Sequence, residues 1–159
     1  IDWGDCDAAG IVFFPNFFAW VDSHFHQFTG SLGFDHRSLL EQYGLLGTPL
    51  RDTRCTYHSP ATYGDRLTIC SRVTKVGQSS LSSAYRFTRG ETFIAEARET
   101  RVMVRQSGTG IEKAPIPIKS DPPRPASKVE GTPFGGSAAM GRAGIDPFSR
   151  SRSTTFLCP

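Results

Sequence analysis

The sequence predicts an α+β domain in which a curved antiparallel sheet wraps around one long helix. The helix is indicated by seven of the twelve phenylalanines, which fall between Phe13 and Phe34. Strand patterns with short turns dominate the chain that follows. A single apolar helix needs a sheet as its packing surface, so both belong to one unit. The length of 159 residues suits one domain with a shorter remainder.

The long helix is predicted to begin near Pro15. Its apolar residues recur at steps of three and four, which marks one buried helix face: Phe14, Phe17, Phe18, Val21, Phe25, Phe28 and Leu32. Proline suits a first helical turn, because its missing N–H has no partner there in any case. Gly30 and Gly33 are expected to end the helix. A second, short helix is predicted at about Arg37–Tyr43.

Strands are predicted on both sides of these helices. Ile1-Asp2-Trp3 has the alternation of a strand end, and Leu46–His58 forms an extended run that Gly47-Thr48-Pro49 interrupts. Three long strands then follow with short turns, which predicts an antiparallel meander: residues 67–73, with Leu67, Ile69, Ser71 and Val73 on one side; residues 81–87, with Leu81, Ser83, Tyr85 and Phe87 on one side; and Thr92–Arg105.

Charge and composition divide the chain into two parts. Residues 1–119 hold 13 basic and 12 acidic side chains, whereas residues 120–159 hold 5 and 3, with 17 of 40 positions Gly, Pro or Ser. The sequence thus predicts a nearly neutral domain at 1–119, with a truncated first strand, and a tail at 120–159 that is disordered or non-native. It favours neither a nucleic-acid nor a membrane partner. Four cysteines without metal-type or disulfide-framework spacing predict a cytoplasmic protein.

The connector before the long helix is the best candidate for chemistry. Asp5 and Asp7 lie just upstream of a helix whose first free N–H groups fall near Phe13 and Phe14. A helix N-terminus favours negative charge, and a carboxylate beside an oxyanion-binding N–H is what acyl transfer needs. An aspartate in a glycine-rich turn also serves as a helix cap or Asx turn, so that alternative stays open.

The segment Gly4-Asp5-Cys6-Asp7-Ala8-Ala9-Gly10-Ile11-Val12-Phe13-Phe14-Pro15-Asn16-Phe17 resembles the signature of hotdog-fold acyl-CoA thioesterases. The hydroxybenzoyl-CoA group is the most similar, and short-chain acyl-CoA thioesterases come second. Leu46-Gly47-Thr48-Pro49 and Tyr63-Gly64-Asp65-x-Leu67-Thr68-Ile69 match in the same order. The likeness covers about residues 1–119. It implies a hotdog fold and hydrolysis of a small, aromatic or short aliphatic, acyl-CoA thioester.

This resemblance also implies roles for individual residues. Asp7 aligns with the catalytic carboxylate, which attacks the thioester carbonyl or activates a water, and the backbone N–H of Phe14 aligns with the donor to the thioester oxygen. Asp22 matches a position at the phenolic end of the acyl group, and Thr48 one that lines the acyl pocket from a partner subunit. Both have a plainer alternative, as a solvated helix charge and a turn residue. Substrate contacts are also expected at Gly10 and Val12.

The nucleotide phosphates of CoA are expected to meet the segment after the third strand. In the hydroxybenzoyl group that stretch is basic, whereas here it offers Lys75, Gln78 and Ser79. Other basic side chains are therefore alternatives for the phosphates: Arg51, Arg54 and Arg86. No cofactor is expected beyond CoA as part of substrate and product, and no metal is expected. His24 and His26 project about 200° apart on a helix and cannot share a metal ion.

Three functions remain to be weighed from the sequence. The first is a thioester hydrolase; the second is a non-catalytic hotdog module that binds an acyl-CoA or a protein; the third is a hotdog dehydratase, which needs a histidine in its pocket. Cys6 has no neighbouring histidine to activate it as a nucleophile, and His58 is expected to be structural. An edge strand and an exposed helix flank predict at least a homodimer, or a homotetramer.

Overall fold

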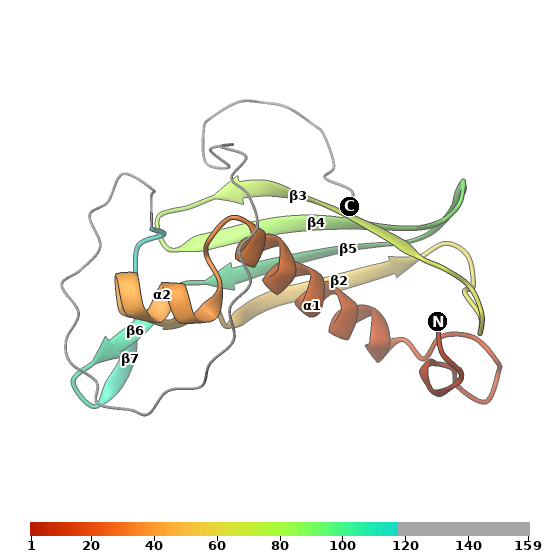
Figure 1. Cartoon of the computed structure of the whole chain (residues 1–159), viewed down its shortest axis with the longest axis horizontal. Coiled ribbons are helices and arrows are strands. Elements are labelled where there is room, and N and C mark those ends of the chain that lie inside the picture. Colours follow the sequence, from red (N-terminus) through yellow and green to blue (C-terminus); the bar gives the residue numbers. More distant parts are fainter. Residues whose placement is uncertain (118–159) are drawn as a thin grey trace, which may run out of the picture.

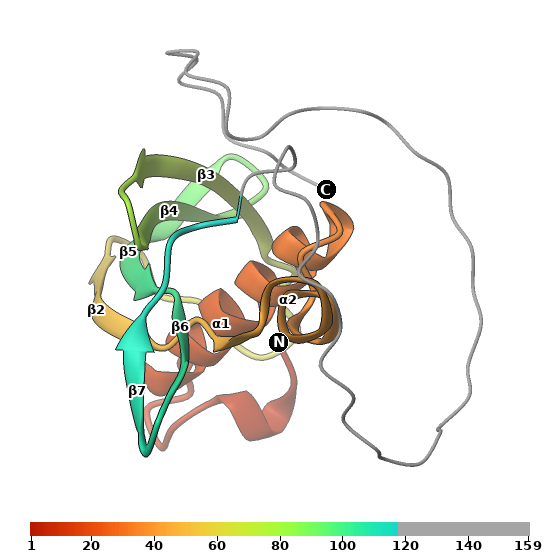
Figure 2. The same ribbon diagram turned by 90° about the vertical axis from the view of Figure 1, so that its left-hand side faces the viewer.

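A computed structural model describes residues 1–117 and shows a four-stranded antiparallel sheet curved around one helix (Figures 1 and 2). The order along this sheet is β2-β5-β4-β3, with β2 at Leu50–Tyr57, β3 at Thr68–Val76, β4 at Ser80–Arg89 and β5 at Thr92–Val102. The helix α1, at Pro15–Ser31, lies diagonally across one face of the sheet. The α+β prediction is confirmed, and so is the hotdog architecture.

The register explains how the sheet holds α1. Leu81, Ser83, Tyr85 and Phe87 of β4 are all buried, as their alternation predicts. They face the apolar side of α1, where Phe17, Val21 and Phe25 are at most 4% exposed. The meander of β3, β4 and β5 is confirmed. The sequence did not indicate that β2 pairs with β5 and forms one edge of this sheet.

A smaller sheet and a second helix extend one end of the domain. Strands β1 at Leu45–Gly47, β6 at Val104–Ser107 and β7 at Gly110–Lys113 pair in the order β1-β6-β7. The predicted strand at Thr92–Arg105 is therefore divided at Met103. The short helix α2 spans His36–Tyr43, close to the prediction. Asp35 caps it, because its carboxylate accepts the backbone N–H of Ser38 at 3.0 Å.

One predicted element is wrong. Ile1-Asp2-Trp3 does not end a strand, because the 3₁₀ helix η1 occupies Trp3–Asp5. The Asp5 carboxylate accepts the N–H of Asp2 at 2.7 Å, a local bond that competes with strand pairing.

Two further sequence predictions concern the C-terminal tail and the membrane. The tail predicted at 120–159 lies outside the described residues, so its assignment stays a prediction. Within residues 1–117, no helix is long and apolar enough to cross a membrane.

Candidate functional site

The connector between η1 and α1 is a hydrogen-bonded loop centred on Asp7. The N–H of Asp7 donates to Ile11 O at 2.9 Å, and the N–H of Gly10 donates to Asp7 O at 2.9 Å. Gly10 has φ +74°, a left-handed conformation that favours glycine. The Asp7 carboxylate accepts the N–H of Ala9 through Oδ1 at 2.8 Å, which is the Asx-turn geometry. Oδ2 has no hydrogen-bond partner within residues 1–117. One oxygen therefore orients the side chain, and the other is available.

A second anchor joins the loop to the start of α1. Asp5 O accepts the N–H of Phe13 at 2.8 Å and the Asn16 side-chain amide at 2.8 Å. The Phe13 N–H, one of two expected donors, is thus already used. The N–H of Phe14 has no acceptor among the described residues, and Pro15, which follows it, has no N–H at all. Phe14 therefore presents the first open donor at the positive end of the helix dipole.

Asp7, Val12 and Phe14 line one open pocket of about 420 Å³. This volume lies within the range of small-molecule sites. The structure thus brings together Asp7, Phe14 and Val12, whereas Gly10 supports the loop through its bond to Asp7 O.

The pocket residues missed in the sequence include three with rings: Phe17, Tyr57 and His58. The ring of Phe17 contacts the rings of Tyr57 and Phe87 at centroid distances of 5.1 and 5.2 Å. The His58 ring stacks on Phe93 at 4.4 Å, so a histidine lies in this pocket although none precedes the helix. Burial, together with a hydrogen bond to Cys55, raises the pKa of Tyr57 to about 12. Its hydroxyl is therefore protonated at neutral pH. Pairing of β2 with β5 brings Tyr57 and His58 to this end of α1.

Asp22 and Thr48 meet elsewhere, around Arg101 of β5. An Arg101 guanidinium nitrogen lies 2.6 Å from Asp22 Oδ1 and 2.9 Å from Glu99 Oε2, and another lies 3.4 Å from Thr48 O. The Tyr85 hydroxyl donates to Glu99 at 2.6 Å. We name the side chains of Asp22, Tyr85, Glu99 and Arg101 the Arg101 cluster. Asp22 is thus neither a solvated charge alone nor a residue of the Asp7 pocket.

The Arg101 cluster is deeply buried on the sheet side. Glu99 and Arg101 are 3% and 5% exposed, whereas the Asp22 side chain is 57% exposed. Burial by itself lowers the pKa of Arg101, but hydrogen bonds to Glu99 and Asp22 outweigh it and raise that pKa. The guanidinium also lies over the Phe25 ring, 4.3 Å from its centroid. The Arg101 cluster could not be predicted from the sequence, because Glu99 and Arg101 look like solvated strand charges there.

The Asp7 pocket and the Arg101 cluster lie at opposite ends of β2. Leu50 pairs with Arg101 at one end, and Tyr57 pairs with Ala95 at the other. These ends are seven residues apart, or about 23 Å along a strand. Along α1, Asp22 lies eight residues beyond Phe14, or about 12 Å. Asp22 accordingly does not line the Asp7 pocket of its own chain.

The three residues expected near the CoA phosphates lie at the Arg101 end. Ser80 pairs with Val102, which places the β3–β4 turn there. Gln78 O and Ser79 O accept the N–H groups of Ile116 and Met103, each at 2.9 Å, so the backbone of this turn is structural. Lys75 is exposed and makes no ion pair within the part of the chain that is described.

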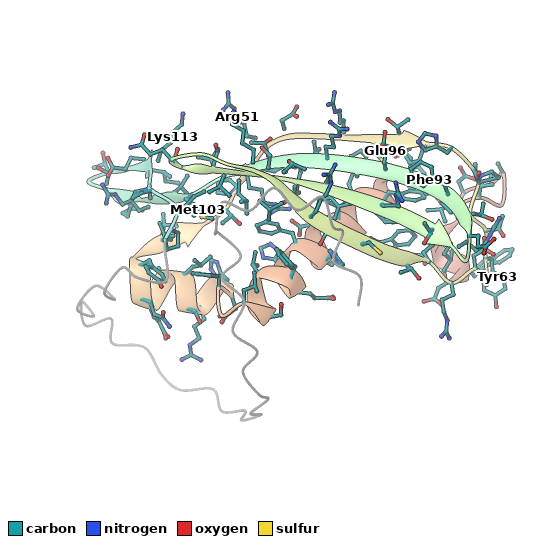
Figure 3. All side chains as sticks on the ribbon, turned by 90° about the horizontal axis from the view of Figure 1, so that it is seen from above. Arg51, Tyr63, Phe93, Glu96, Met103 and Lys113 are labelled. Atoms are coloured by element: carbon teal, nitrogen blue, oxygen red, sulfur yellow. The ribbon has the colours of Figure 1, made fainter. Side chains whose placement is uncertain are left out.

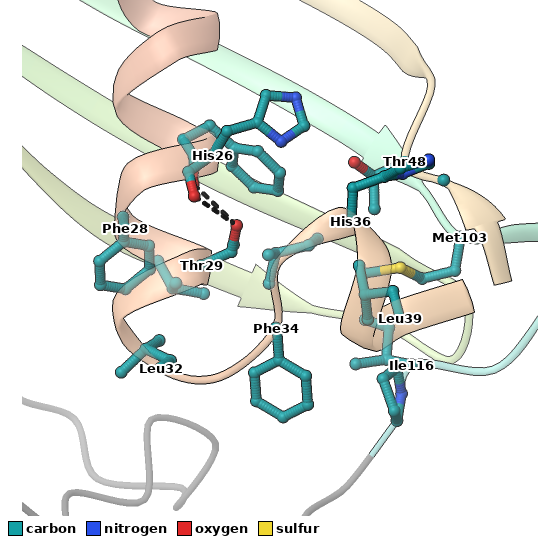
Figure 4. A pocket seen from close by; sticks show the side chains of 15 residues that line it. His26, Phe28, Thr29, Leu32, Phe34, His36, Leu39, Thr48, Met103 and Ile116 are labelled. Atoms are coloured by element: carbon teal, nitrogen blue, oxygen red, sulfur yellow. Dashed lines mark hydrogen bonds between the residues drawn. The ribbon is translucent and has the colours of Figure 1, made fainter. Parts of the chain in front are cut away.

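An apolar pocket lies between the end of α1, α2 and the sheet (Figure 4). Among its lining residues are Phe34, Leu39 and Met103, with Thr48 and His26 at its edge. Its cavity volume is about 30 Å³, which is the share of a single water molecule in the liquid. This pocket is too small for an acyl group and is a packing gap of the core.

The alternative phosphate ligands lie on the other face of the sheet. Figure 3 shows Arg51 and Glu96 on the side away from α1. Arg54 and Arg98 pair across β2 and β5, and Arg86 lies over the Phe93 ring at 5.3 Å. Glu96 pairs with Arg86, so charges of both signs alternate here. The structure does not bring these arginines to the Asp7 pocket.

Comparisons with known proteins agree with this architecture. The family model of the thioesterase-like superfamily matches residues 1–126. The 4-hydroxybenzoyl-CoA thioesterase of Pseudomonas sp. (strain CBS-3) is 28% identical over 123 residues, covering 74% of this chain and 87% of that protein. The 1,4-dihydroxy-2-naphthoyl-CoA hydrolase of Synechococcus elongatus (strain ATCC 33912 / PCC 7942 / FACHB-805) is 26% identical over 117 residues, covering 74% and 85%.

Solved structures give the same result. A gentisyl-coenzyme A thioesterase superposes with a TM-score of 0.65 at 30% identity, covering 74% of this chain and 91% of that one. The structure of the Pseudomonas thioesterase superposes with a TM-score of 0.67 at 28% identity, covering 74% and 88%. From its sequence match and its fold, the chain belongs to the thioesterase-like superfamily of hotdog proteins.

Proposed function

We propose that this protein hydrolyses a small aromatic acyl-CoA thioester to the free acid and CoA. The observation that carries the proposal is the pocket that Asp7 and Phe14 line together, where the Asp7 Oδ2 and the Phe14 N–H have no hydrogen-bond partner among residues 1–117. Relatives named as hydroxybenzoyl-, gentisyl- and dihydroxynaphthoyl-CoA hydrolases support an aromatic acyl group, and they favour an enzyme over a binding module. The reaction consumes water and needs no cofactor.

The chemistry follows from these two groups. The Phe14 N–H donates to the thioester carbonyl oxygen and stabilises the negative charge that develops there. Asp7 Oδ2 then acts in one of two ways. As a nucleophile it bonds to the carbonyl carbon, the C–S bond breaks, CoA leaves as thiolate, and water hydrolyses the mixed anhydride. As a general base it removes the proton from a water that attacks the same carbon.

A homodimer completes this site. The strand β2 is an edge of the four-stranded sheet, so one row of its backbone groups lacks a strand partner among residues 1–117. Large apolar side chains are exposed along β2 and the connector beside it: Ile11, Phe13, Phe14, Leu50 and Tyr57, at 38–57%. An unpaired edge flanked by exposed apolar side chains favours pairing with a second copy.

Antiparallel pairing of two β2 strands brings the Arg101 cluster of one protomer next to the Asp7 pocket of its partner. It places Leu50 of one protomer beside the partner's Tyr57, because full-length antiparallel pairing opposes the two ends. The Arg101 end, with Asp22 and Thr48, then lies beside the partner's Asp7 pocket. Lys75 of β3, next to the β3–β4 turn, lies at that same end, and we expect an extended CoA to reach it. Each active site thus draws Asp7 and Phe14 from one protomer and the other residues from its partner.

A panel of thioesters tests the proposed reaction. Benzoyl-, 4-hydroxybenzoyl-, phenylacetyl- and short aliphatic acyl-CoAs are incubated with the protein, and free CoA is followed with a thiol reagent. We expect aromatic thioesters to be hydrolysed fastest. Release of no thiol from any of them contradicts hydrolysis and supports the binding module.

Mixed dimers test the shared site. Asp7→Asn and Asp22→Asn proteins are denatured together, refolded and assayed with 4-hydroxybenzoyl-CoA. We expect about a quarter of the parental activity, because half of the dimers are mixed and one of their two sites is intact. If both residues acted within one chain, mixing would restore nothing. Light scattering that shows a monomer would contradict the shared site directly.

A further inference from the structure

The buried charges of the Arg101 cluster carry a desolvation free energy that packing alone does not explain. The Glu99 carboxylate and the Arg101 guanidinium are almost wholly buried beneath α1, where Arg101 also contacts the exposed Asp22 carboxylate of that helix. Burying such charges costs several kcal/mol per ion, and apolar residues of similar volume often give equal or greater stability. Arg101 Nε is also buried without a hydrogen-bond partner in the described part of the chain. The cluster is therefore not optimised for stability.

The geometry links the buried charges to one exposed atom. Glu99 is fixed by the Tyr85 hydroxyl at 2.6 Å, and in turn holds Arg101 at 2.9 Å. Arg101 then binds Asp22 through Oδ1 at 2.6 Å. His26, one helical turn away, lies 3.7 Å from the same oxygen. Asp22 Oδ2 has no hydrogen-bond partner among residues 1–117. A carboxylate on a helix surface would otherwise rotate freely, whereas this one has a fixed free oxygen.

We infer that Arg101 is a positioning residue for substrate choice: it orients Asp22 so that Oδ2 accepts a hydrogen bond from a hydroxyl group on the acyl ring. This inference rests on the proposed function, in which Asp22 faces the acyl group bound at the partner's Asp7. One guanidinium nitrogen of Arg101 contacts both carboxylates while the other reaches Thr48 O, and a lysine has only a single nitrogen on a shorter side chain. Arg101 thereby favours hydroxylated over plain aromatic acyl groups.

The test compares 4-hydroxybenzoyl-CoA with benzoyl-CoA. We expect Arg101→Lys to lower kcat/KM for the hydroxylated substrate about tenfold, as for a hydrogen bond to a charged group. For benzoyl-CoA, which has no hydroxyl, we expect a change of less than about twofold. Arg98→Lys, on the exposed face of the same strand, is the matched control and should change neither value.

A double-mutant cycle separates positioning from a general structural role. If Arg101 acts only through Asp22, then in an Asp22→Asn background Arg101→Lys does not change the ratio of the kcat/KM values for the two substrates any further. An equal loss for both substrates means that Arg101 is merely structural and overturns the inference. Should Arg101→Lys fail to fold, as circular dichroism would show, Glu99→Gln with Arg101→Gln removes both charges and keeps polar groups. This double variant is expected to lose the preference for 4-hydroxybenzoyl-CoA over benzoyl-CoA.

The inference and the proposed function fail differently. A parent protein that hydrolyses both thioesters with equal kcat/KM overturns the role of Arg101 and leaves the hydrolase intact. A parent that hydrolyses no acyl-CoA overturns the proposed function itself.

Discussion

The hydrogen bond between Tyr85 and Glu99 allows a worked prediction of stability. The Tyr85 hydroxyl and the Glu99 carboxylate are 2.6 Å apart, and the residues are 2% and 3% exposed, so no water replaces a lost donor. Tyr85→Phe removes one oxygen and keeps the ring, so the cavity contribution is small. Within residues 1–117, Glu99 then keeps only its hydrogen bond from Arg101. A hydrogen bond to a buried charge is worth about 1.5–3 kcal/mol, which is the loss we expect.

Urea unfolding followed by circular dichroism measures this loss. We expect a lower midpoint at an unchanged slope, and a Tm lower by roughly 5–10 °C. Both proteins are compared at one concentration, because dimerisation adds to apparent stability. Tyr63→Phe is the matched control: Tyr63 is 60% exposed and its hydroxyl has no hydrogen bond within residues 1–117. A Tyr85→Phe protein as stable as this control would refute the reasoning.

Two further predictions concern carboxylates outside the site. Asp35→Ala removes the cap of α2 and should cost about 1 kcal/mol in urea unfolding; no loss would mean that the cap does not stabilise the helix. A backbone hydrogen bond from Thr62, with the bond from Arg89, lowers the pKa of Asp65. A lowered folded pKa adds stability that is present above the unfolded pKa of about 4 and lost as pH falls through the folded value. Asp65→Asn should therefore be less stable than the parent at pH 7 and approach it below pH 4; a pH-independent difference would contradict this.

The sequence predicts this fold well where the local pattern matches the final packing. The apolar steps of α1 and the alternation of β4 each report one buried face, so Phe17, Val21, Tyr85 and Phe87 are all in the core. The strand predicted at Ile1–Trp3 is wrong, because its strand-like alternation is outweighed by the hydrogen bond from the N–H of Asp2 to the Asp5 carboxylate.

The site is predicted less completely than the fold. The Asp7 loop could be found because its residues are contiguous and resemble a family signature. Tyr57, His58 and Arg101 could not, since each comes to its neighbours through strand pairing across many residues. Periodicity places Arg98 and Arg101 on opposite faces of β5 but does not show which face is buried. The burial of Arg101 depends on which side of β5 faces α1.

The central claim is that the Asp7 carboxylate performs the chemistry in front of the Phe14 N–H. Asp7→Asn keeps the shape of the side chain and the oxygen that accepts the Ala9 N–H, but removes the nucleophile or base. Steady-state hydrolysis of 4-hydroxybenzoyl-CoA is the most direct measurement. We predict a fall in kcat of about 100- to 10,000-fold with an unchanged unfolding midpoint. An Asp7→Asn protein that hydrolyses the thioester at the parental rate would contradict the assignment.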